Sequence, residues 1–181
     1  MSRAGIMSMN KVLITEHEIQ DRIRTLAAEI ERDYPKGDEI HLVAVLKGGF
    51  MFLADLVRAM STGVTMDFMA LSSYGKETTS SGQVRVLKDL DSSLENRHVI
   101  IVEDIVDTGL TLHYLQDILR ARAPRTVRTA CLLSKPSRRR VDVSVDYIGF
   151  TIDDHFVVGY GLDYGEKYRN LPYIAILGSE Q

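Results

Sequence analysis

Apolar positions recur along the chain in two periods, and together they predict alternating helices and strands. Thr15 and Glu18 have the spacing of a capping box, and apolar residues then recur every three or four positions. These residues are Ile19, Ile23, Leu26, Ala27 and Ile30. The pattern predicts an amphipathic helix that ends before Pro35.

Short apolar runs predict the strands. Residues 40–46 form one such run, which Lys47-Gly48-Gly49 closes, and residues 50–60 follow as a helix. Residues 98–102 have the continuous pattern of a strand covered on both faces, and residues 110–123 follow as another helix. Further strands are expected at residues 66–71, 83–87, 126–133, 147–150, 156–158 and 173–177.

One segment between two predicted strands has almost nothing to bury. Residues 72–82 are rich in Ser, Thr, Gly and Lys, so we expect a mobile surface loop at the tip of a long hairpin. Elsewhere strands alternate with helices, which predicts an α/β fold with a parallel sheet. Ligands of such sheets bind beyond the carboxyl ends of the strands, which here are Lys47-Gly48-Gly49, residues 103–111 and Lys135.

Length and composition narrow the class of protein. A chain of 181 residues fits a single domain over residues 1–181, in which we expect residues 1–10 to be flexible. The net charge of -3 offers no broad positive field, so we expect no nucleic-acid partner. Cys131 is the only cysteine and lies in an apolar run, which predicts a buried packing residue. No stretch approaches the roughly 20 apolar residues of a membrane span, and a cytoplasmic location is expected.

Residues 102–111 carry the strongest chemical signal. Two carboxylates, Glu103 and Asp104, follow a predicted strand, and Asp107-Thr108-Gly109-Leu110-Thr111 then opens a helix. A helix N-terminus presents unpaired N–H groups and a positive dipole end, which bind phosphate. Carboxylates would repel phosphate but bind sugar hydroxyls or Mg²⁺ well. The segment therefore indicates a phosphorylated sugar as the ligand.

Residues 102–111 resemble the phosphoribosyl pyrophosphate signature of the type I phosphoribosyltransferases, with its acidic pair and Asp-Thr-Gly-x-Thr loop. The likeness extends from about residue 11 to residue 177 and is specific to the hypoxanthine-guanine phosphoribosyltransferases. Leu46-Lys47-Gly48-Gly49 resembles their pyrophosphate loop. Phe156-Val157-Val158-Gly159-Tyr160 and Leu162-Asp163-Tyr164 resemble their base-stacking and metal segment.

The resemblance implies a mainly parallel twisted sheet flanked by helices, with a small hood formed by the chain ends. It also implies Mg²⁺-dependent transfer of a 5-phosphoribosyl group from phosphoribosyl pyrophosphate to hypoxanthine or guanine, which is a step of purine salvage. Pyrophosphate would be the second product. A homodimer or homotetramer is expected.

The same resemblance implies a role for individual residues. Asp107 would accept the purine N7 proton as general base. Lys47, Gly48 and Arg169 would bind pyrophosphate, together with the N–H group of Gly49, and Ser73 and Tyr74 would belong to a lid. The phosphoribosyl group would contact Glu103, Asp104, Asp107, Thr108, Gly109, Leu110 and Thr111. The purine would contact Lys135, Phe156, Val157 and Asp163, and Mg²⁺ would be held by Glu103, Asp104 and Asp163.

Several readings stay open at this stage. Leu110 stands where the family often has Lys, so we expect only a backbone contact with phosphate there. An ordinary N-cap role for Asp107 is compatible with its place before a helix. Arg138-Arg139-Arg140 is interpreted as a solvated face or a subunit contact. Two alternative functions remain: the same fold acting on xanthine or a pyrimidine, or a nucleic-acid-binding regulator that retains the phosphoribosyl site.

Overall fold

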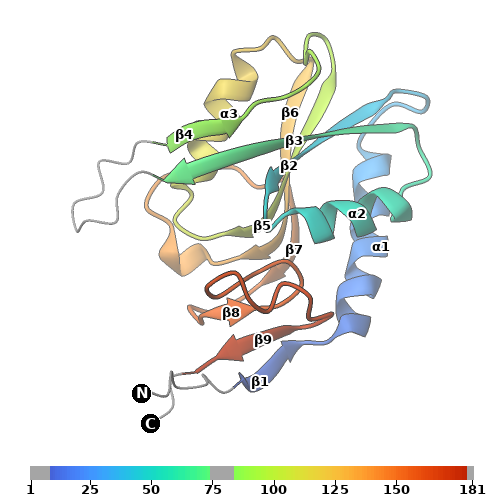
Figure 1. Cartoon of the computed structure of the whole chain (residues 1–181). Coiled ribbons are helices and arrows are strands. Elements are labelled where there is room, and N and C mark those ends of the chain that lie inside the picture. Colours follow the sequence, from blue (N-terminus) through green and yellow to red (C-terminus); the bar gives the residue numbers. More distant parts are fainter. Residues whose placement is uncertain (1–8, 74–83, 179–181) are drawn as a thin grey trace.

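The computed structural model describes residues 9–73 and 84–178, in which helices and strands alternate as the sequence predicts (Figure 1). In chain order the elements are β1 (Met9–Ile14), α1 (Glu16–Arg32), β2 (Ile40–Leu46), α2 (Phe50–Ala59), β3 (Val64–Ser73), β4 (Val84–Lys88), β5 (His98–Val106), α3 (Leu110–Arg120), β6 (Thr126–Ser134), the 3-10 turn η1 (Pro136–Arg138), β7 (Tyr147–Thr151), β8 (Val157–Val158) and β9 (Ile174–Leu177).

The capping box predicted for the first helix is present. The Thr15 side chain accepts a hydrogen bond from the backbone N–H of Glu18, and the Glu18 carboxylate accepts one from the backbone N–H of Thr15. The five apolar residues of the predicted stripe are all buried. Helix α1 ends at Arg32, before Pro35, so both of its predicted limits are confirmed.

Six strands form the main sheet in the order β4-β3-β2-β5-β6-β7. Strands β3, β2, β5, β6 and β7 are parallel, and β4 runs antiparallel to β3 as the second arm of the predicted hairpin. The α/β fold with a mainly parallel sheet is therefore confirmed. Strand β5 runs to Val106, past the predicted end at residue 102, because it stays hydrogen-bonded to β6 as far as Ser134.

Helices cover both faces of this sheet. One hydrophobic cluster joins α1 and α2 to Ile100 and Val102 of β5, and the second joins α3 to Val99 and Ile101. Alternate residues of β5 thus face opposite layers, as a strand requires. Cys131 is fully buried in the second cluster, as predicted.

A smaller sheet with the order β1-β9-β8 forms the expected hood (Figure 1). Strand β1 pairs antiparallel with β9, so the blue start and the red end of the chain lie side by side. The sequence did not predict β1, and its first two residues, Met9 and Asn10, fall in the segment expected to be flexible. Val157 and Ile174 of the hood are buried in the cluster that contains α1 and α2.

Two predictions concern parts of the chain that are only partly described. Ser73 is the last residue of β3, and Tyr74 lies outside the described residues, as does most of the predicted loop at residues 72–82. The lid therefore stays a prediction. Among the described residues, no helix is both long enough and apolar enough to cross a membrane.

Candidate active site

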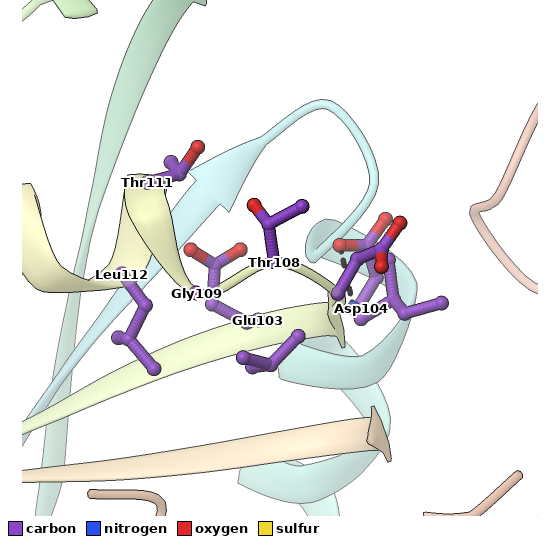
Figure 2. Close-up of a pocket in the computed structure, with 9 residues that line it drawn as sticks. Glu103, Asp104, Thr108, Gly109, Thr111 and Leu112 are labelled. Atoms are coloured by element: carbon purple, nitrogen blue, oxygen red, sulfur yellow. Dashed lines mark hydrogen bonds between the residues drawn. The ribbon is translucent and has the colours of Figure 1, made fainter. Parts of the chain in front are cut away.

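The loop between β5 and α3 lies at the carboxyl edge of the main sheet and lines a cavity of about 230 Å³. Figure 2 shows this cavity with the side chains around it. The lining residues are Glu103, Asp104, Ile105, Val106, Asp107, Thr108, Gly109, Thr111 and Leu112. Six of the seven residues predicted to bind the phosphoribosyl group are thus brought together. Leu110, the seventh, is exposed at the first position of α3.

The N-cap residue of α3 has no side chain with which to cap the helix. Its N-cap is Gly109, whose φ of 84° lies in the left-handed region that glycine adopts without strain. Because Gly109 holds the N-cap position, the N-cap role considered for Asp107 is wrong. The Thr108 hydroxyl accepts a long bond of 3.4 Å from the Leu110 N–H. An uncapped helix start of this kind is suited to bind an anion.

The basic cluster next to this loop has a role that the sequence did not reveal. The Arg139 guanidinium donates to the carbonyl oxygens of Val106 and Asp107 and to Ser134 Oγ, the last at 2.9 Å. The backbone N–H of Arg140 donates to the Thr108 carbonyl at 2.9 Å. The interpretation of this cluster as a solvated face or subunit contact is therefore wrong for Arg139, which fixes the loop backbone.

Glu103 and Asp104 are consecutive residues of β5, so their side chains leave the strand in opposite directions, and both line the first cavity (Figure 2). Glu103 is buried in the cavity below α3, and burial, with the Asp104 charge second, raises its pKa well above the usual range. Burial also raises the pKa of Asp104 to about 6, and the charge of Asp163 acts in the same direction. Two acidic groups are thus held where their negative charge is poorly compensated.

Asp104 lies against the loop that follows β2. A Cβ atom on Gly48 would be 1.6 Å from Asp104 Oδ2, so only glycine fits without moving that carboxylate. The Leu46–Lys47 peptide bond that opens this loop is cis. The N–H of Gly49 donates to the Val45 carbonyl at 3.1 Å. This N–H group therefore already has an acceptor within the protein, and the expectation that it binds an anion is wrong.

A second cavity of about 300 Å³ adjoins the first and shares Asp104, Ile105 and Asp107 with it. The other lining residues are Lys135, Phe156, Val157, Leu162 and Asp163. All four residues predicted to contact the purine therefore line one cavity. Residues far apart in the sequence meet here, because the cavity lies between the end of β5, the residue that follows β6 and the segment around β8.

Lys135 and Phe156 differ in their surroundings. Only 6% of Lys135 is exposed, and its Nζ donates to the His155 carbonyl at 2.6 Å, so it is not a solvated loop residue. Phe156 is 54% exposed and meets the Tyr164 ring edge to face at 5.7 Å. A cavity lined by an exposed aromatic ring and a buried ammonium group can hold a flat, polar ring.

Asp107 stands at the border of the two cavities with an arginine beside it. The Arg138 Nε atom lies 3.2 Å from Asp107 Oδ1, and Arg138 Nη1 lies 3.6 Å from Asp154 Oδ2. Asp154 Oδ1 is in turn 3.7 Å from Lys135 Nζ. The sequence suggested only a solvated face or a subunit contact for Arg138, and it did not single out Asp154, because a turn aspartate carries no specific signal.

Lys47 and Arg169 both form ion pairs with Glu166, a residue that the sequence did not suggest. Lys47 Nζ is 2.8 Å from Glu166 Oε2, and Arg169 Nη2 is 3.3 Å from Glu166 Oε1. Arg169 Nη2 also lies 3.0 Å from Asp163 Oδ1. No motif marks Glu166, because its position depends on the fold of two loops more than 100 residues apart in the chain.

The predicted metal ligands do not form a complete site. Among the described residues, no three His, Cys, Asp or Glu side chains are grouped closely enough to hold an ion by themselves. The charge of Asp163 nevertheless helps to raise the pKa of Asp104, and both residues line the second cavity. Mg²⁺ is usually held by one or two carboxylates together with substrate oxygens. Such an ion fits this donor set if the substrate completes it.

The comparisons with known proteins agree with this geometry. Residues 13–165 match the phosphoribosyl transferase domain. The hypoxanthine-guanine phosphoribosyltransferase of Bacillus subtilis is 50% identical over 170 residues, which cover 93% of each chain. A hypoxanthine-guanine phosphoribosyltransferase structure from Bacillus anthracis has a TM-score of 0.90 at 48% identity and covers 94% of this chain and 100% of its own.

A hypoxanthine phosphoribosyltransferase structure from Staphylococcus aureus has a TM-score of 0.91 at 44% identity. It covers 98% of this chain and 97% of its own. The likeness therefore extends over nearly all of this chain.

Proposed function

Because the chain belongs to the phosphoribosyltransferase family, and within it to the hypoxanthine-guanine phosphoribosyltransferases of purine salvage, we propose that its two adjoining cavities bind phosphoribosyl pyrophosphate and a 6-oxopurine. The enzyme transfers a 5-phosphoribosyl group to a purine base and releases pyrophosphate. A complete site must hold the 5'-phosphate, the ribose, the departing pyrophosphate and the base.

One observation carries this proposal above the others. The cavity of the β5–α3 loop and the cavity of Lys135 and Phe156 share Asp107. A sugar phosphate in the first cavity and a base in the second would therefore meet beside the Asp107 carboxylate. Such an arrangement gives the reacting atoms the proximity that a group transfer requires.

The first cavity suits the phosphoribosyl group. The uncapped start of α3 and the hydroxyls of Thr108 and Thr111 would bind the 5'-phosphate, and Gly109 and Leu110 would contribute backbone contacts. Glu103 and Asp104 would accept hydrogen bonds from the ribose hydroxyls. Binding a ligand with hydroxyls or positive charge would offset the cost of burying these two acidic groups.

The family match supports a divalent metal requirement, and we propose that the ion is Mg²⁺. The carboxylates of Glu103, Asp104 and Asp163 would hold it, directly or through water, together with donor oxygens. When bound, Mg²⁺ neutralises charge on the pyrophosphate and so makes it a better leaving group.

Two cations and a tight loop would receive the pyrophosphate. Lys47 and Arg169 approach the same point from different loops, and Gly48 allows the backbone to lie directly against Asp104. Positive groups placed where negative charge develops stabilise the transition state of such a transfer.

The second cavity suits a 6-oxopurine. The Lys135 ammonium would donate to the 6-oxygen, which adenine lacks, and the Phe156 ring would stack on the base. Val157 and Asp163 would contact its remaining edge. The Asp107 carboxylate would accept the proton from N7 as the base attacks the anomeric carbon.

The proposal extends to organisation. We propose that residues 1–181 form one domain, because the hood and the main sheet share one buried cluster. We also propose a cytoplasmic location and assembly into a homodimer or homotetramer. The enzyme names of the relatives support the substrates, whereas only the expectations from sequence support the location and the oligomer.

A direct assay tests the proposal. Pyrophosphate release from phosphoribosyl pyrophosphate is measured with hypoxanthine, guanine, xanthine, adenine and uracil, each with Mg²⁺ and with EDTA. We expect release with hypoxanthine or guanine only when Mg²⁺ is present. Faster release with uracil or xanthine would favour the alternative substrates, and release that is independent of the base would contradict the assignment of the second cavity.

A further inference from the structure

Four charged side chains form a cluster on the pyrophosphate side of the site. Glu166 has one carboxylate oxygen 2.8 Å from Lys47 Nζ and the other 3.3 Å from Arg169 Nη2. Asp163 Oδ1 lies 3.0 Å from the same Arg169 Nη2. Glu166 therefore bridges the two cations to which we assign the pyrophosphate.

The two acidic residues of this cluster differ in how firmly they are held. The Asp163 and Arg169 side chains are 29% and 21% exposed, and Arg169 also donates to the Gly161 carbonyl at 2.7 Å. The Glu166 and Lys47 side chains are 64% and 65% exposed. Pairs as exposed as Glu166 and Lys47 are stabilised only weakly, so the Glu166 carboxylate can leave for water at little cost.

The backbone of Glu166 stays fixed without its side chain. Its N–H donates to Asp163 Oδ2 at 2.8 Å, and this bond does not depend on the carboxylate. Glu166 thus presents two negatively charged oxygens to the groups that would bind the oxygens of a phosphate.

A cation that pairs with Glu166 is not fully available to pyrophosphate. An anionic ligand between Lys47 and Arg169 must displace the carboxylate or lie beside a like charge, and either event weakens binding. The carboxylate can return as the product leaves, because the bond to Asp163 Oδ2 anchors the Glu166 backbone independently of the carboxylate. The pairing therefore acts against retention of pyrophosphate.

We propose that Glu166 is a positioning residue that occupies the pyrophosphate-binding cations when the site is empty and thereby promotes release of the product. It holds Lys47 and Arg169 near each other and is displaced by pyrophosphate. This inference rests on the pyrophosphate role proposed above for Lys47 and Arg169. The ligand class is a magnesium-complexed diphosphate, either free or as part of the donor.

The test compares Glu166→Gln with the parent by calorimetric titration of inorganic pyrophosphate in Mg²⁺ buffer. We expect the variant to bind pyrophosphate about three- to tenfold more tightly, since one competing charge is removed. Steady-state kinetics should show a lower inhibition constant for pyrophosphate and a lower KM for phosphoribosyl pyrophosphate. Where product release limits turnover, kcat falls as well.

Glu95→Gln is the matched control. Glu95 is exposed and precedes β5, so it lies at the opposite edge of the sheet, and the substitution removes the same charge. Its pyrophosphate affinity should equal that of the parent. A Glu166→Gln protein that unfolds at the same temperature as the parent but binds pyrophosphate equally or more weakly would overturn the inference.

Binding to the parent protein distinguishes failure of the proposed function from failure of the role proposed for Glu166. If the parent itself binds neither pyrophosphate nor phosphoribosyl pyrophosphate, Lys47 and Arg169 are not pyrophosphate ligands and this inference is overturned with the proposed site. If the parent binds both and only the effect of Glu166→Gln is missing, the proposed site stands and the role of Glu166 is refuted.

Discussion

Asp104 and Gly48 are in such close contact that a methyl group on residue 48 would overlap the Asp104 carboxylate. The contact joins the loop after β2 to strand β5, and both belong to the site to which we assign the donor. The position of the Asp104 carboxylate therefore depends on the absence of a side chain at residue 48 of the neighbouring loop.

We expect Gly48→Ala to weaken binding of phosphoribosyl pyrophosphate with Mg²⁺ by about tenfold or more, because Asp104 must turn away from its position. Gly63→Ala is the control, since a Cβ atom there meets nothing within 4 Å. Calorimetric titration of both variants measures the effect. Equal affinity in the two variants would show that the position of Asp104 is not critical.

Asp104→Asn should stabilise the ligand-free protein in a pH-dependent way. Burial raises the pKa of Asp104 from 3.8 to about 6, so the ionised carboxylate destabilises the folded state. This cost is absent below about pH 4, grows as the pH rises towards 6, and is complete above that value. Two pKa units correspond to at most about 3 kcal/mol, and partial exposure reduces the figure.

Urea unfolding of parent and Asp104→Asn in EDTA, at several pH values between about 4 and 8, checks this prediction. The free energies of unfolding should differ least in acid and most at neutral pH, with the variant more stable. A constant difference across this range would contradict it. The same variant should lose affinity for the donor with Mg²⁺.

Asp107→Asn should lower kcat by about a hundredfold or more while donor affinity changes little, because general base catalysis typically contributes at least that factor. Asn keeps the size of the side chain and an oxygen that can accept from Arg138. Initial rates with hypoxanthine, together with equilibrium binding of phosphoribosyl pyrophosphate, separate the two effects. Turnover equal to that of the parent would refute the role of Asp107.

Lys135→Met should raise the KM for hypoxanthine by about 10- to 100-fold, the usual effect of losing a hydrogen bond to a charged group. Methionine keeps most of the volume of the lysine side chain, so the packing around residue 135 is largely retained. Donor affinity, measured in the absence of base, is the control and should be unchanged. If KM for hypoxanthine stays at the parental value, Lys135 does not contact the base.

Arg139→Ala should destabilise the phosphate-binding loop. The guanidinium bonds to the carbonyl groups of Val106 and Asp107 are lost, which should reduce the free energy of unfolding by about 1 to 3 kcal/mol and weaken donor binding. Arg140→Ala removes the same charge but keeps the backbone bond to Thr108. Urea unfolding and donor titration should distinguish the two variants. Similar losses of stability and donor affinity in the two variants would show that the effect comes from net charge and not from the Arg139 hydrogen bonds.

Much of the fold could be predicted from local pattern. The capping residues of α1 and the apolar run of β2 define their own limits, so both elements begin and end where the sequence indicates. Strand β1 could not be predicted in this way. Its residues become a strand only because β9, about 160 residues later, pairs with them.

The same distinction applies to the site. The β5–α3 loop has a recognisable signature because phosphate binding depends on consecutive residues. Glu166 and Arg139 have no such signature, since their contacts with Lys47 and Val106 arise only after distant loops are brought together. Lys135 was expected from family resemblance, whereas its burial follows from its place at the end of β6.

The pairing of β1 with β9 also bears on synthesis of the protein. Strand β9 is the central strand of the hood and follows every other strand that the described residues form. A nascent chain can assemble the β5–α3 loop well before then, but β8 has no partner strand until residue 177 has left the ribosome. A chain truncated before β9 should therefore be unable to form the cavity to which we assign the purine.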